Sequence, residues 1–405
     1  MTTSTATCSW PYRFRFIIWI CVCTLVFLSL QFHDLIPAFM VSPDGVMFEF
    51  PSFTSQKEDK GSSGGDLHRF VESLKSRLPV EYHSRILSSA KSAVKPVWGC
   101  KADNINVSPP VDKFIFVHVF KTAGSTMRSF FDHYATLCPS KSYATLTSCT
   151  SIEPSSLNTS IWKPCVLKYD RKDGERHNLK QTPVPKENLH SYDMIGGHFR
   201  IGLMDHLDDT GSVNPRNRHL VFVRNAAMKY ISGKVYIRTK AQRNLTSYDI
   251  ICEIEEEIKG MIQSQEHHMK YTNYLLTPTQ ARQRQKESWS YQQRAQVVMQ
   301  NLIDYNCTIG VVEDMKGSIE MLREVLDPSR QASDLFEAYS GDAPTKSNVS
   351  PLSSKSILET LQQELPETYE NLTEFVKYEQ QITDFAVTLH NLQRQLQKDM
   401  MADKR

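Results

Sequence analysis

The sequence predicts an α/β protein in which a parallel sheet is flanked by helices, with an N-terminal transmembrane anchor and C-terminal helices. Two segments predict the sheet: FIFVHVFKTAGSTMR, from Phe114, and HLVFVRNAAMKYISGK, from His219. Each runs from apolar residues through a short polar turn into an amphipathic stretch, the pattern of a buried strand, a tight turn and a helix. Strands that alternate with helices form parallel sheets, whose ligands bind at the carboxyl ends of the strands.

The N-terminal region predicts a membrane anchor. Residues 1–15 include Arg13 and Arg15, and residues 16–32 are uncharged and mostly apolar. About 17 residues is the low end for a bilayer span, and basic residues ahead of a span keep that end cytoplasmic. We therefore expect a cytoplasmic tail, a signal anchor and a lumenal body. The alternative is a cleaved signal peptide, although no small-residue cleavage site follows promptly. A short span favours early secretory membranes, so a single-pass type II protein of the Golgi membrane is expected.

Sequons and cysteines agree with a lumenal body. Asn-x-Ser/Thr sequons, which accept glycans in secreted proteins, occur at Asn106, Asn158, Asn244, Asn306, Asn348 and Asn371. The cysteines beyond the anchor are Cys100, Cys138, Cys149, Cys165, Cys252 and Cys307, an even set that could pair in an oxidising compartment. The sequence leaves the connectivity open, and we expect at least one local bridge among Cys138, Cys149 and Cys165.

The rest of the 405 residues divides into three parts. Residues 33–111 are rich in Pro, Ser, Gly and mixed charge, which predicts a stem with a short helix near Leu67–Leu78. Residues 112–330 are expected to form the catalytic domain, with a loop-rich polar insertion at 139–181. Residues 331–405 are expected to form a C-terminal helical extension, which docks on the core or pairs with another chain. The net charge of +2 says little about partners.

Hydrophobic spacing gives the later elements of this plan. It predicts helices over Ser247–Thr272 and Glu287–Asp304, then a strand over Thr308–Val312. Residues 328–351 are predicted as loop, and Leu352–Lys398 as two helices split by Pro366.

The turn after the first strand has the composition of an anion site. A helix N-terminus presents unpaired N–H groups and a partial positive charge. Gly124 permits close approach to a ligand, Ser125 and Thr126 can donate hydrogen bonds, and Lys121 adds a full charge. The turn is only P-loop-like, because in a nucleotide P-loop the Lys follows the glycines and a Ser or Thr after it holds Mg²⁺. An ordinary capped helix is the alternative interpretation.

The second segment repeats the plan with an Arg. Arg224 follows the strand His219–Val223, and Ser232 lies two helical turns into a helix that opens at Ala226. The planar guanidinium suits a terminal phosphate, because it can form paired hydrogen bonds. Between Thr210 and Tyr248 every charged residue is basic: Arg216, Arg218, Arg224, Lys229, Lys234, Arg238, Lys240 and Arg243. Such a stretch suits an anionic ligand, although some of these residues are expected to form a solvated face.

A histidine provides a candidate base. His198 follows a short apolar strand and two glycines, in Tyr192-Asp-Met-Ile-Gly-Gly-His-Phe-Arg. A neutral imidazole is available near neutral pH. His118 alternates into the interior of its strand and is expected to be a satisfied core residue, and His267-His268 to face solvent. No cluster has metal-ligand spacing, so no metal site is predicted.

The order and spacing of these motifs resembles the Golgi carbohydrate sulfotransferases, in particular the branch that contains heparan sulfate 2-O-sulfotransferase. The resemblance runs from about Lys113 to Leu326, including Asn306-Cys-Thr-Ile-Gly-Val-Val-Glu-Asp, which is similar to that family's late strand.

The resemblance implies a function and a set of site residues. The co-substrate would be 3′-phosphoadenosine 5′-phosphosulfate (PAPS), and the acceptor a hydroxyl of a glycosaminoglycan-like polysaccharide or another glycan. The residues implied at the 5′-phosphosulfate are Lys121, Thr122, Ala123, Gly124, Ser125 and Thr126. Arg224 and Ser232 would bind the 3′-phosphate. His198 would be the catalytic base, and Lys121 would stabilise the leaving group. Nucleic acid is not an expected partner, and the oligomeric state is left open.

Three departures from that family concern Phe120, Asn225-Ala226 and Gly196. The family usually has Pro before the loop Lys, Asp-Pro after the Arg, and a first histidine at the position of Gly196. The third departure weakens the assignment of the 2-O position more than that of the co-substrate.

Other functions are open. A Golgi glycosyltransferase is one alternative, but many of these need Asp-x-Asp, which the chain lacks. A P-loop kinase is disfavoured by the position of Lys121 in the turn. A catalytically inactive lumenal binding protein that keeps the fold is the last alternative.

Overall fold

The fold is described from a computed structural model, which covers residues 80–98, 100, 111–148, 164–172, 175–183, 186–207, 213–241, 245–340 and 352–402. The predicted anchor (16–32), the predicted helix Leu67–Leu78 and the sequons at Asn106, Asn158, Asn244 and Asn348 lie outside these residues. None of the helices that are described is long and apolar enough to cross a membrane.

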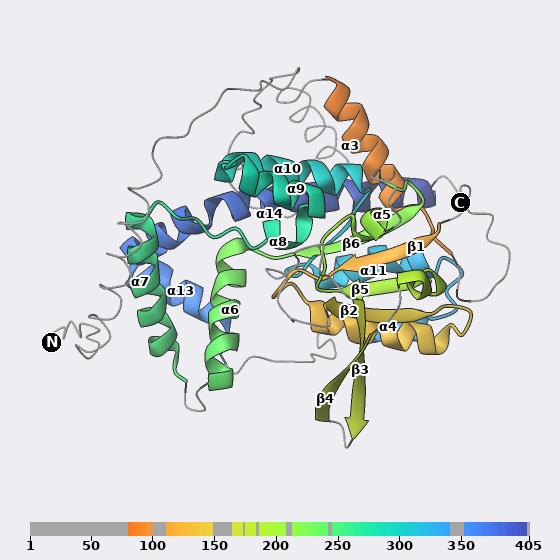
Figure 1. The fold of residues 1–405 in the computed structure, drawn as a ribbon, viewed down its shortest axis with the longest axis horizontal. Helices are drawn as coiled ribbons and strands as arrows, with labels where there is room; N and C mark the ends of the chain where they lie inside the picture. The colour runs from red at the N-terminus through yellow and green to blue at the C-terminus, as the bar shows by residue number, and fades with distance from the viewer. Residues whose placement is uncertain are drawn as a thin grey trace, which may run out of the picture. The chain divides into compact units, whose positions relative to one another are not determined.

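A seven-stranded sheet forms the centre of the fold, with strand order β4-β3-β2-β5-β1-β6-β7 (Figure 1). Five neighbouring strands are parallel: β2 (Tyr143–Ser148), β5 (Met194–Gly197), β1 (Lys113–Val117), β6 (Asn217–Val223) and β7 (Thr308–Val311). Strands β3 (Pro164–Lys172) and β4 (Glu175–Pro183) continue the sheet as an antiparallel hairpin. The predicted α/β architecture with a parallel sheet flanked by helices is confirmed.

Helices cover both faces of the parallel strands, so β1 is buried at every position. Phe114 and Phe116 lie on one face, with ring centroids 5.9 and 5.7 Å from that of Phe131 in α4 (Gly124–Leu137). Helices α11 (Met315–Leu326) and α12 (Ser333–Ser340) complete this hydrophobic cluster. Ile115 and Val117 alternate to the other face, as the two-residue period of a strand requires.

The remaining helices are α5 (Leu203–Leu207), α6 (Ala226–Ala241), α7 (Ser247–Gln263), α8 (Thr272–Leu275), α9 (Pro278–Lys286), α10 (Tyr291–Asp304), α13 (Ser354–Glu364) and α14 (Pro366–Ala402). Helix α14 packs against β6, β7, α10 and the first described helix, α3 (Val80–Ala93). Its N-terminal half joins α6, α7 and α13 in a second hydrophobic cluster, around Ile231, Ile254 and Phe375. The predicted split at Pro366 and the opening of a helix at Ala226 are both confirmed.

Helix α14 also seals the edge of the sheet. Strand β7 is an edge strand, and exposed edge groups invite pairing with other chains. The side chain of Gln393 accepts a hydrogen bond from the N–H of Ile309 (2.9 Å) and donates to the carbonyl of Cys307 (2.7 Å). The His390 Nδ1–H donates to the carbonyl of Ile309 (2.7 Å). The C-terminal segment therefore docks on the core and completes it.

The predicted loop-rich insertion at 139–181 is wrong. It contains β2, β3 and the start of β4, and β2 pairs with β5 inside the parallel sheet. Strand β2 reads YATLTS, a short and partly polar sequence whose stability comes from its neighbours in the sheet. The local sequence of such a strand predicts it only weakly, because its formation depends on pairing with strands that are distant in sequence.

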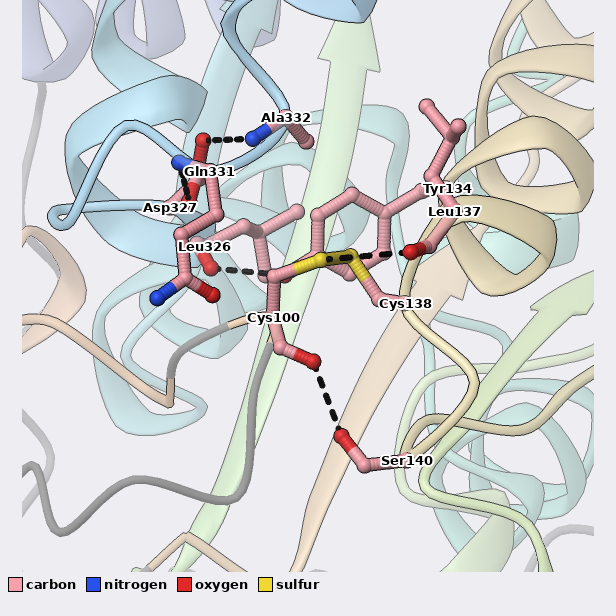
Figure 2. The surroundings of a disulfide bond; sticks show 9 residues. All are labelled: Cys100, Tyr134, Leu137, Cys138, Ser140, Leu326, Asp327, Gln331 and Ala332. Atoms are coloured by element: carbon pink, nitrogen blue, oxygen red, sulfur yellow. Dashed lines mark hydrogen bonds between the residues drawn. A yellow bond between two sulfur atoms is a disulfide. The ribbon is translucent and has the colours of Figure 1, made fainter.

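Part of the predicted stem belongs to the folded body. Helix α3 (Val80–Ala93) packs against α10 and α14, and the Ser89 hydroxyl donates to the carbonyl of Ile303 (2.7 Å). The segment that follows is bound by a disulfide between Cys100 and Cys138 at the end of α4 (Figure 2). The Ser140 hydroxyl also donates to the carbonyl of Cys100 (2.9 Å). Cys100 is therefore bound both to Cys138 and to Ser140.

The cysteine expectation needs correction. Cys138 pairs with Cys100, ahead of the insertion, and not with Cys149 or Cys165. Cys252 on α7 is also disulfide-bonded, whereas Cys307 is buried and free in the described structure. The expected pairing of all six cysteines is therefore wrong, because Cys307 is free. A local bridge between Cys149 and Cys165 stays a prediction, since Cys149 lies outside the described residues.

Two helix boundaries and one predicted loop also differ from the predictions. Helix α7 ends at Gln263, because Gln265 adopts a left-handed φ of 54°. The predicted helix from Glu287 begins at Tyr291, where the Ser290 hydroxyl and the Gln293 side chain form a capping box. The predicted loop 328–351 contains helix α12. Just before this helix, the N–H groups of Gln331 and Ala332 donate hydrogen bonds to the Asp327 carboxylate (Figure 2).

Candidate active site

The carboxyl ends of the central strands bring the candidate residues together. In the sheet register, Val117 of β1 lies between Gly197 of β5 and Val221 of β6. His118 directly follows β1, His198 directly follows β5, and Arg224 directly follows β6. Residues from three distant segments therefore meet at the carboxyl ends of the central strands, where parallel α/β proteins bind ligands.

The turn after β1 has an unusual backbone. Lys121 and Ala123 adopt left-handed φ angles of 66° and 58°, which cost free energy for residues other than glycine. The buried Thr122 hydroxyl donates to the carbonyl of Val119 (2.9 Å) and is used inside the turn. Helix α4 begins at Gly124, and no side chain of the described residues caps it. Its first turn therefore presents backbone donors to whatever binds there.

Gly124 is required by a close contact with a histidine. A Cβ atom at this position would lie 1.5 Å from Nε2 of His118. No side chain can therefore be accommodated there unless the His118 ring moves, and this ring is packed into the site. The other two predicted turn residues, Ser125 and Thr126, are half-buried on the first turn of α4.

Lys121 is a cation held by an aromatic ring. Its Nζ lies 3.9 Å from the ring centroid of Tyr236 in α6, and Lys240 contacts the same ring (4.4 Å). No carboxylate in the described part of the chain lies within salt-bridge distance of Lys121. Burial first, and then the charges of Arg224 and Lys240, lower the pKa of Lys121 to about 8. The lowered pKa is consistent with a cluster of positive charges, in which Lys121 comes from the first strand–turn–helix segment and Arg224 and Lys240 come from the second.

His198 and His118 form a stacked pair. Their ring centroids are 3.9 Å apart, and Nδ1 of His198 lies 3.1 Å from the carbonyl oxygen of His118. Because a carbonyl can only accept, the proton of a neutral His198 is on Nδ1, and Nε2 carries the lone pair. Burial first, and then the charge of Arg128, lower the pKa of His198 to about 4. The ring is therefore neutral at pH 7 and able to accept a proton.

The expectation that His118 is a satisfied core residue is wrong. The ring is buried, but Nδ1 has no hydrogen-bond partner among the residues described. Burial, followed by the charges of His198, Arg128 and Lys121, lowers the pKa of His118 well below its ordinary value. His118 thus lies against His198 on one side and Gly124 at the start of α4 on the other. Its Nδ1 atom remains without a hydrogen bond.

Arg224 is held more firmly than Lys121. Its backbone N–H donates to the Tyr271 hydroxyl (3.1 Å), and its carbonyl accepts from that hydroxyl and from Thr383 (both 3.2 Å). Its guanidinium donates to the hydroxyl of Ser354 in α13 (2.7 Å) and lies 3.9 Å from Glu313. Ser232, the other residue implied at the 3′-phosphate, is buried in α6 and makes no side-chain hydrogen bond within the described structure.

The junction before α6 is capped. The Asn225 side-chain oxygen accepts from the N–H of Met228 (3.0 Å), which is an N-cap bond. The Asn225 N–H donates to Glu313, the residue that follows Val312 after β7 (3.2 Å). Burial raises the pKa of Glu313, against the opposing effect of its own N–H, of the Asn225 N–H and of the charge of Arg224.

Much of the basic stretch is internally neutralised. Lys229 forms a buried ion pair with Glu379 of α14 (2.8 Å), and Lys234 and Arg238 pair with Glu253 of α7. The pKa of Glu379, which burial alone would raise, is held at about 2 by Lys229 and His268. His268 is bound to Glu379 (2.8 Å) and mostly buried, so the expectation that it faces solvent is wrong.

Within the described residues, no group of three or more His, Cys, Asp or Glu side chains could hold a metal ion. No protein-family model matches the chain, and no curated protein matches it in sequence.

Sequence reasoning missed three contributors to the site: His118, Tyr236 and Glu313. Two of them had a usable signal. His118 lies just beyond the last residue of β1, and Glu313 lies just beyond a predicted strand, both at the ligand-binding edge. Tyr236 had none, because only the packing of α6 beside the first turn brings its ring under Lys121.

Proposed function

We propose that this protein is a PAPS-dependent sulfotransferase that transfers a sulfuryl group to a hydroxyl of a carbohydrate. The observation that carries the proposal is the meeting of Lys121, His198 and Arg224 at the carboxyl ends of three adjacent parallel strands. We further propose, from the anchor and sequon patterns, that the enzyme is a single-pass type II protein of the Golgi membrane with a lumenal body.

The residues fit a ligand with two separated anionic groups. At the first turn, an uncapped helix N-terminus, Lys121 and two left-handed residues form a cradle for an oxygen-rich anion. At the second turn, Arg224 offers a guanidinium, and the unbonded Ser232 lies further along α6. The lowered pKa values of both cations show that burial disfavours their charge. A bound anion would offset that cost.

Each residue then has a role in transfer. PAPS, when bound, supplies the activated sulfuryl group. Sulfuryl transfer resembles phosphoryl transfer, so positioning and charge stabilisation are the main contributions of the protein. Lys121 stabilises negative charge at the first turn. The unprotonated Nε2 of His198 accepts the proton of the acceptor hydroxyl, and the bond from Nδ1 to the carbonyl of His118 keeps the ring in that tautomer.

The test is transfer of radiolabelled sulfate from PAPS to a panel of polysaccharides and glycans by the full-length chain. We expect label on at least one acceptor, and a loss of about 10²- to 10⁴-fold in His198→Ala, the usual contribution of a general base. The His198→Ala variant should still bind 3′-phosphoadenosine 5′-phosphate.

The matched control is His190→Ala, an exposed histidine in the short 3-10 helix Lys186–Ser191 that precedes β5. It should transfer sulfate at the wild-type rate. If the folded wild type neither transfers sulfate nor binds the nucleotide, the proposal is wrong. Nucleotide binding without transfer to any acceptor would instead support an inactive binding protein that keeps the fold.

A further inference from the structure

A cavity of about 430 Å³ lies beside the candidate active site. Phe120, the residue before Lys121, forms part of its wall, and α6 forms another part through Gly233 and Lys234. Thr272 of α8, Arg284 of α9 and Arg294 of α10 also line it. Its volume lies in the range of small-ligand sites, and it has aromatic residues with a few polar groups.

Not all cations around this cavity are available to a ligand. Lys229 is paired with Glu379, and Lys234 with Glu253 and Glu257. The cations that remain are Lys270, Arg284 and Arg294, and none of them has a carboxylate within salt-bridge distance among the described residues. Glu266 also lines the cavity, but it is exposed and forms no ion pair with them in the described part of the chain.

A third guanidinium, that of Arg200, lies next to Thr272 in the wall of the cavity. Arg200 is only 7% exposed, and its Nη1 donates to the carbonyl of Thr272 (2.9 Å). The Arg284 Nη1 donates to the hydroxyl of the same Thr272 (3.2 Å), so two cations bind one residue. The Nε of Arg200 has no hydrogen-bond partner in the described structure. Like charges this close repel each other, and buried charges without a counter-ion are costly.

The pKa shifts agree with this geometry. Burial, followed by the charge of Arg284, lowers the pKa of Arg200 to about 10. Burial, followed by the charge of Arg294, lowers the pKa of Arg284. An anion in the cavity would stabilise all three guanidiniums.

The arginines are also held in place. The Arg294 guanidinium lies 4.7 Å from the ring centroid of Tyr291, and its Nε donates to the carbonyl of Trp289 (2.8 Å). Tyr291 stacks in turn on Tyr378 of α14 (5.8 Å). A planar guanidinium fixed in this way can bind a carboxylate or a sulfate ester with paired hydrogen bonds.

We propose that this cavity is an anion subsite in which Arg284 and Arg294, supported by Arg200, bind a negatively charged group on a neighbouring sugar of the acceptor. The ligand chemistry is a carboxylate or a sulfate ester on a saccharide. The role as an acceptor subsite rests on the proposed function. The position fits that role, because Phe120 leads directly into Lys121, and the ring of Tyr274, two residues after Thr272, lies 5.9 Å from that of His198.

The test measures binding of three saccharide probes to the full-length chain by titration calorimetry. The probes are an unsulfated oligosaccharide of alternating hexosamine and uronate, the same oligosaccharide with its carboxyls reduced to alcohols, and that reduced form after O-sulfation. We expect the reduced form to bind at least tenfold more weakly than one of the two charged forms, and the stronger charged form identifies the group that is bound.

The variants are Arg284→Gln and Arg294→Gln. Each should weaken binding of the charged probe by on the order of tenfold, since a hydrogen bond to a charged group is lost. The control is Arg282→Gln, an exposed arginine on the same helix α9, which should bind like the wild type. Arg200 is left intact because it is buried, and thermal unfolding checks the fold of every variant.

Equal binding of the charged and reduced probes would overturn the proposal, as would wild-type affinity in both Arg284→Gln and Arg294→Gln. Binding of 3′-phosphoadenosine 5′-phosphate is measured beside it and should be unchanged in both variants. If that nucleotide does not bind the wild type while the charged probe still depends on Arg284, the proposed transfer reaction fails and the anion subsite stands.

Discussion

The two strand–turn–helix segments follow the same sequence plan, yet the structure treats them differently. The turn after β1 has two left-handed non-glycine residues, and in the described structure it has neither a side-chain cap on α4 nor a carboxylate beside Lys121. The turn after β6 has a cap from Asn225, and its Arg224 is bound to Ser354 and lies near Glu313. The first turn is strained and open. The second is largely bound by other groups of the protein, although Nε of Arg224 makes no hydrogen bond within the described structure.

This difference has a consequence for ligand binding. An anion at the first turn would gain contacts with groups that make few others, so that turn should contribute most of the binding free energy. At the second turn an anion must replace existing bonds of Arg224, so the net gain there is smaller. The strain at Lys121 and Ala123 agrees with this assignment, because strained backbone concentrates at functional sites.

The largest expected effect tests the first turn. The change Lys121→Ala should reduce sulfate transfer by about 10²- to 10³-fold, as expected when a group that stabilises developing charge is removed. Transfer kinetics measure this loss, and Lys95→Ala, an exposed lysine beyond α3, serves as the control. A loss of less than about threefold would show that the open turn does not bind the reacting group.

The pH dependence of kcat/KM should reflect the titration of both His198 and Lys121. His198 accepts a proton only when neutral, so kcat/KM should fall as the pH drops through its pKa of about 4. Lys121 contributes its charge only when protonated, so kcat/KM should also fall as the pH rises through its pKa of about 8. A bound anion raises the pKa of Lys121, so the alkaline limb of kcat should lie at higher pH.

The alkaline limb should disappear in Lys121→Arg, because a guanidinium stays protonated throughout this range. A pH profile of this variant that still falls near pH 8 would assign that limb to another group.

A smaller effect tests the closed second turn. The change Ser354→Ala removes a hydrogen-bond partner from the Arg224 guanidinium, so an anion no longer has to displace it. Binding of 3′-phosphoadenosine 5′-phosphate should become tighter by a few-fold, in line with about 1 kcal/mol for one hydrogen bond. Titration calorimetry measures the affinity, and the exposed Ser356→Ala is the control. Weaker binding in Ser354→Ala would mean that Ser354 orients Arg224 for its ligand.

The smallest effect concerns stability alone. The change Asn225→Ala removes the N-cap of α6 and should lower the free energy of unfolding by about 1 kcal/mol. Nucleotide affinity should stay within about twofold of the wild type. Chemical denaturation measures the first quantity, and Asn225→Ser should restore part of it. A tenfold fall in nucleotide affinity would show that Asn225 belongs to the binding site.

The features that could be read from the sequence were those with a strong local pattern. The apolar runs before Lys121 and Arg224 predicted β1 and β6, and Pro366 predicted the division between α13 and α14. The polar strands β2, β3 and β4 were missed because their stability comes from pairing, which leaves little trace in composition. The start of α10 could have been found, since Ser290 and Gln293 form a capping box that is visible as Ser-x-x-Gln.

By itself, the sequence determined the alternation of strands and helices, and with it the placing of Lys121, His198 and Arg224 at strand ends. These follow from side-chain periodicity and turn chemistry, which act over a few residues. Only the tertiary structure decided that His118 stacks on His198, that Tyr236 lies beneath Lys121, and that Arg224 is bound to Ser354. Contacts between distant segments also set the charge environment of the site. Burial and neighbouring charges that no local pattern records lower the pKa values of its histidines and of Lys121.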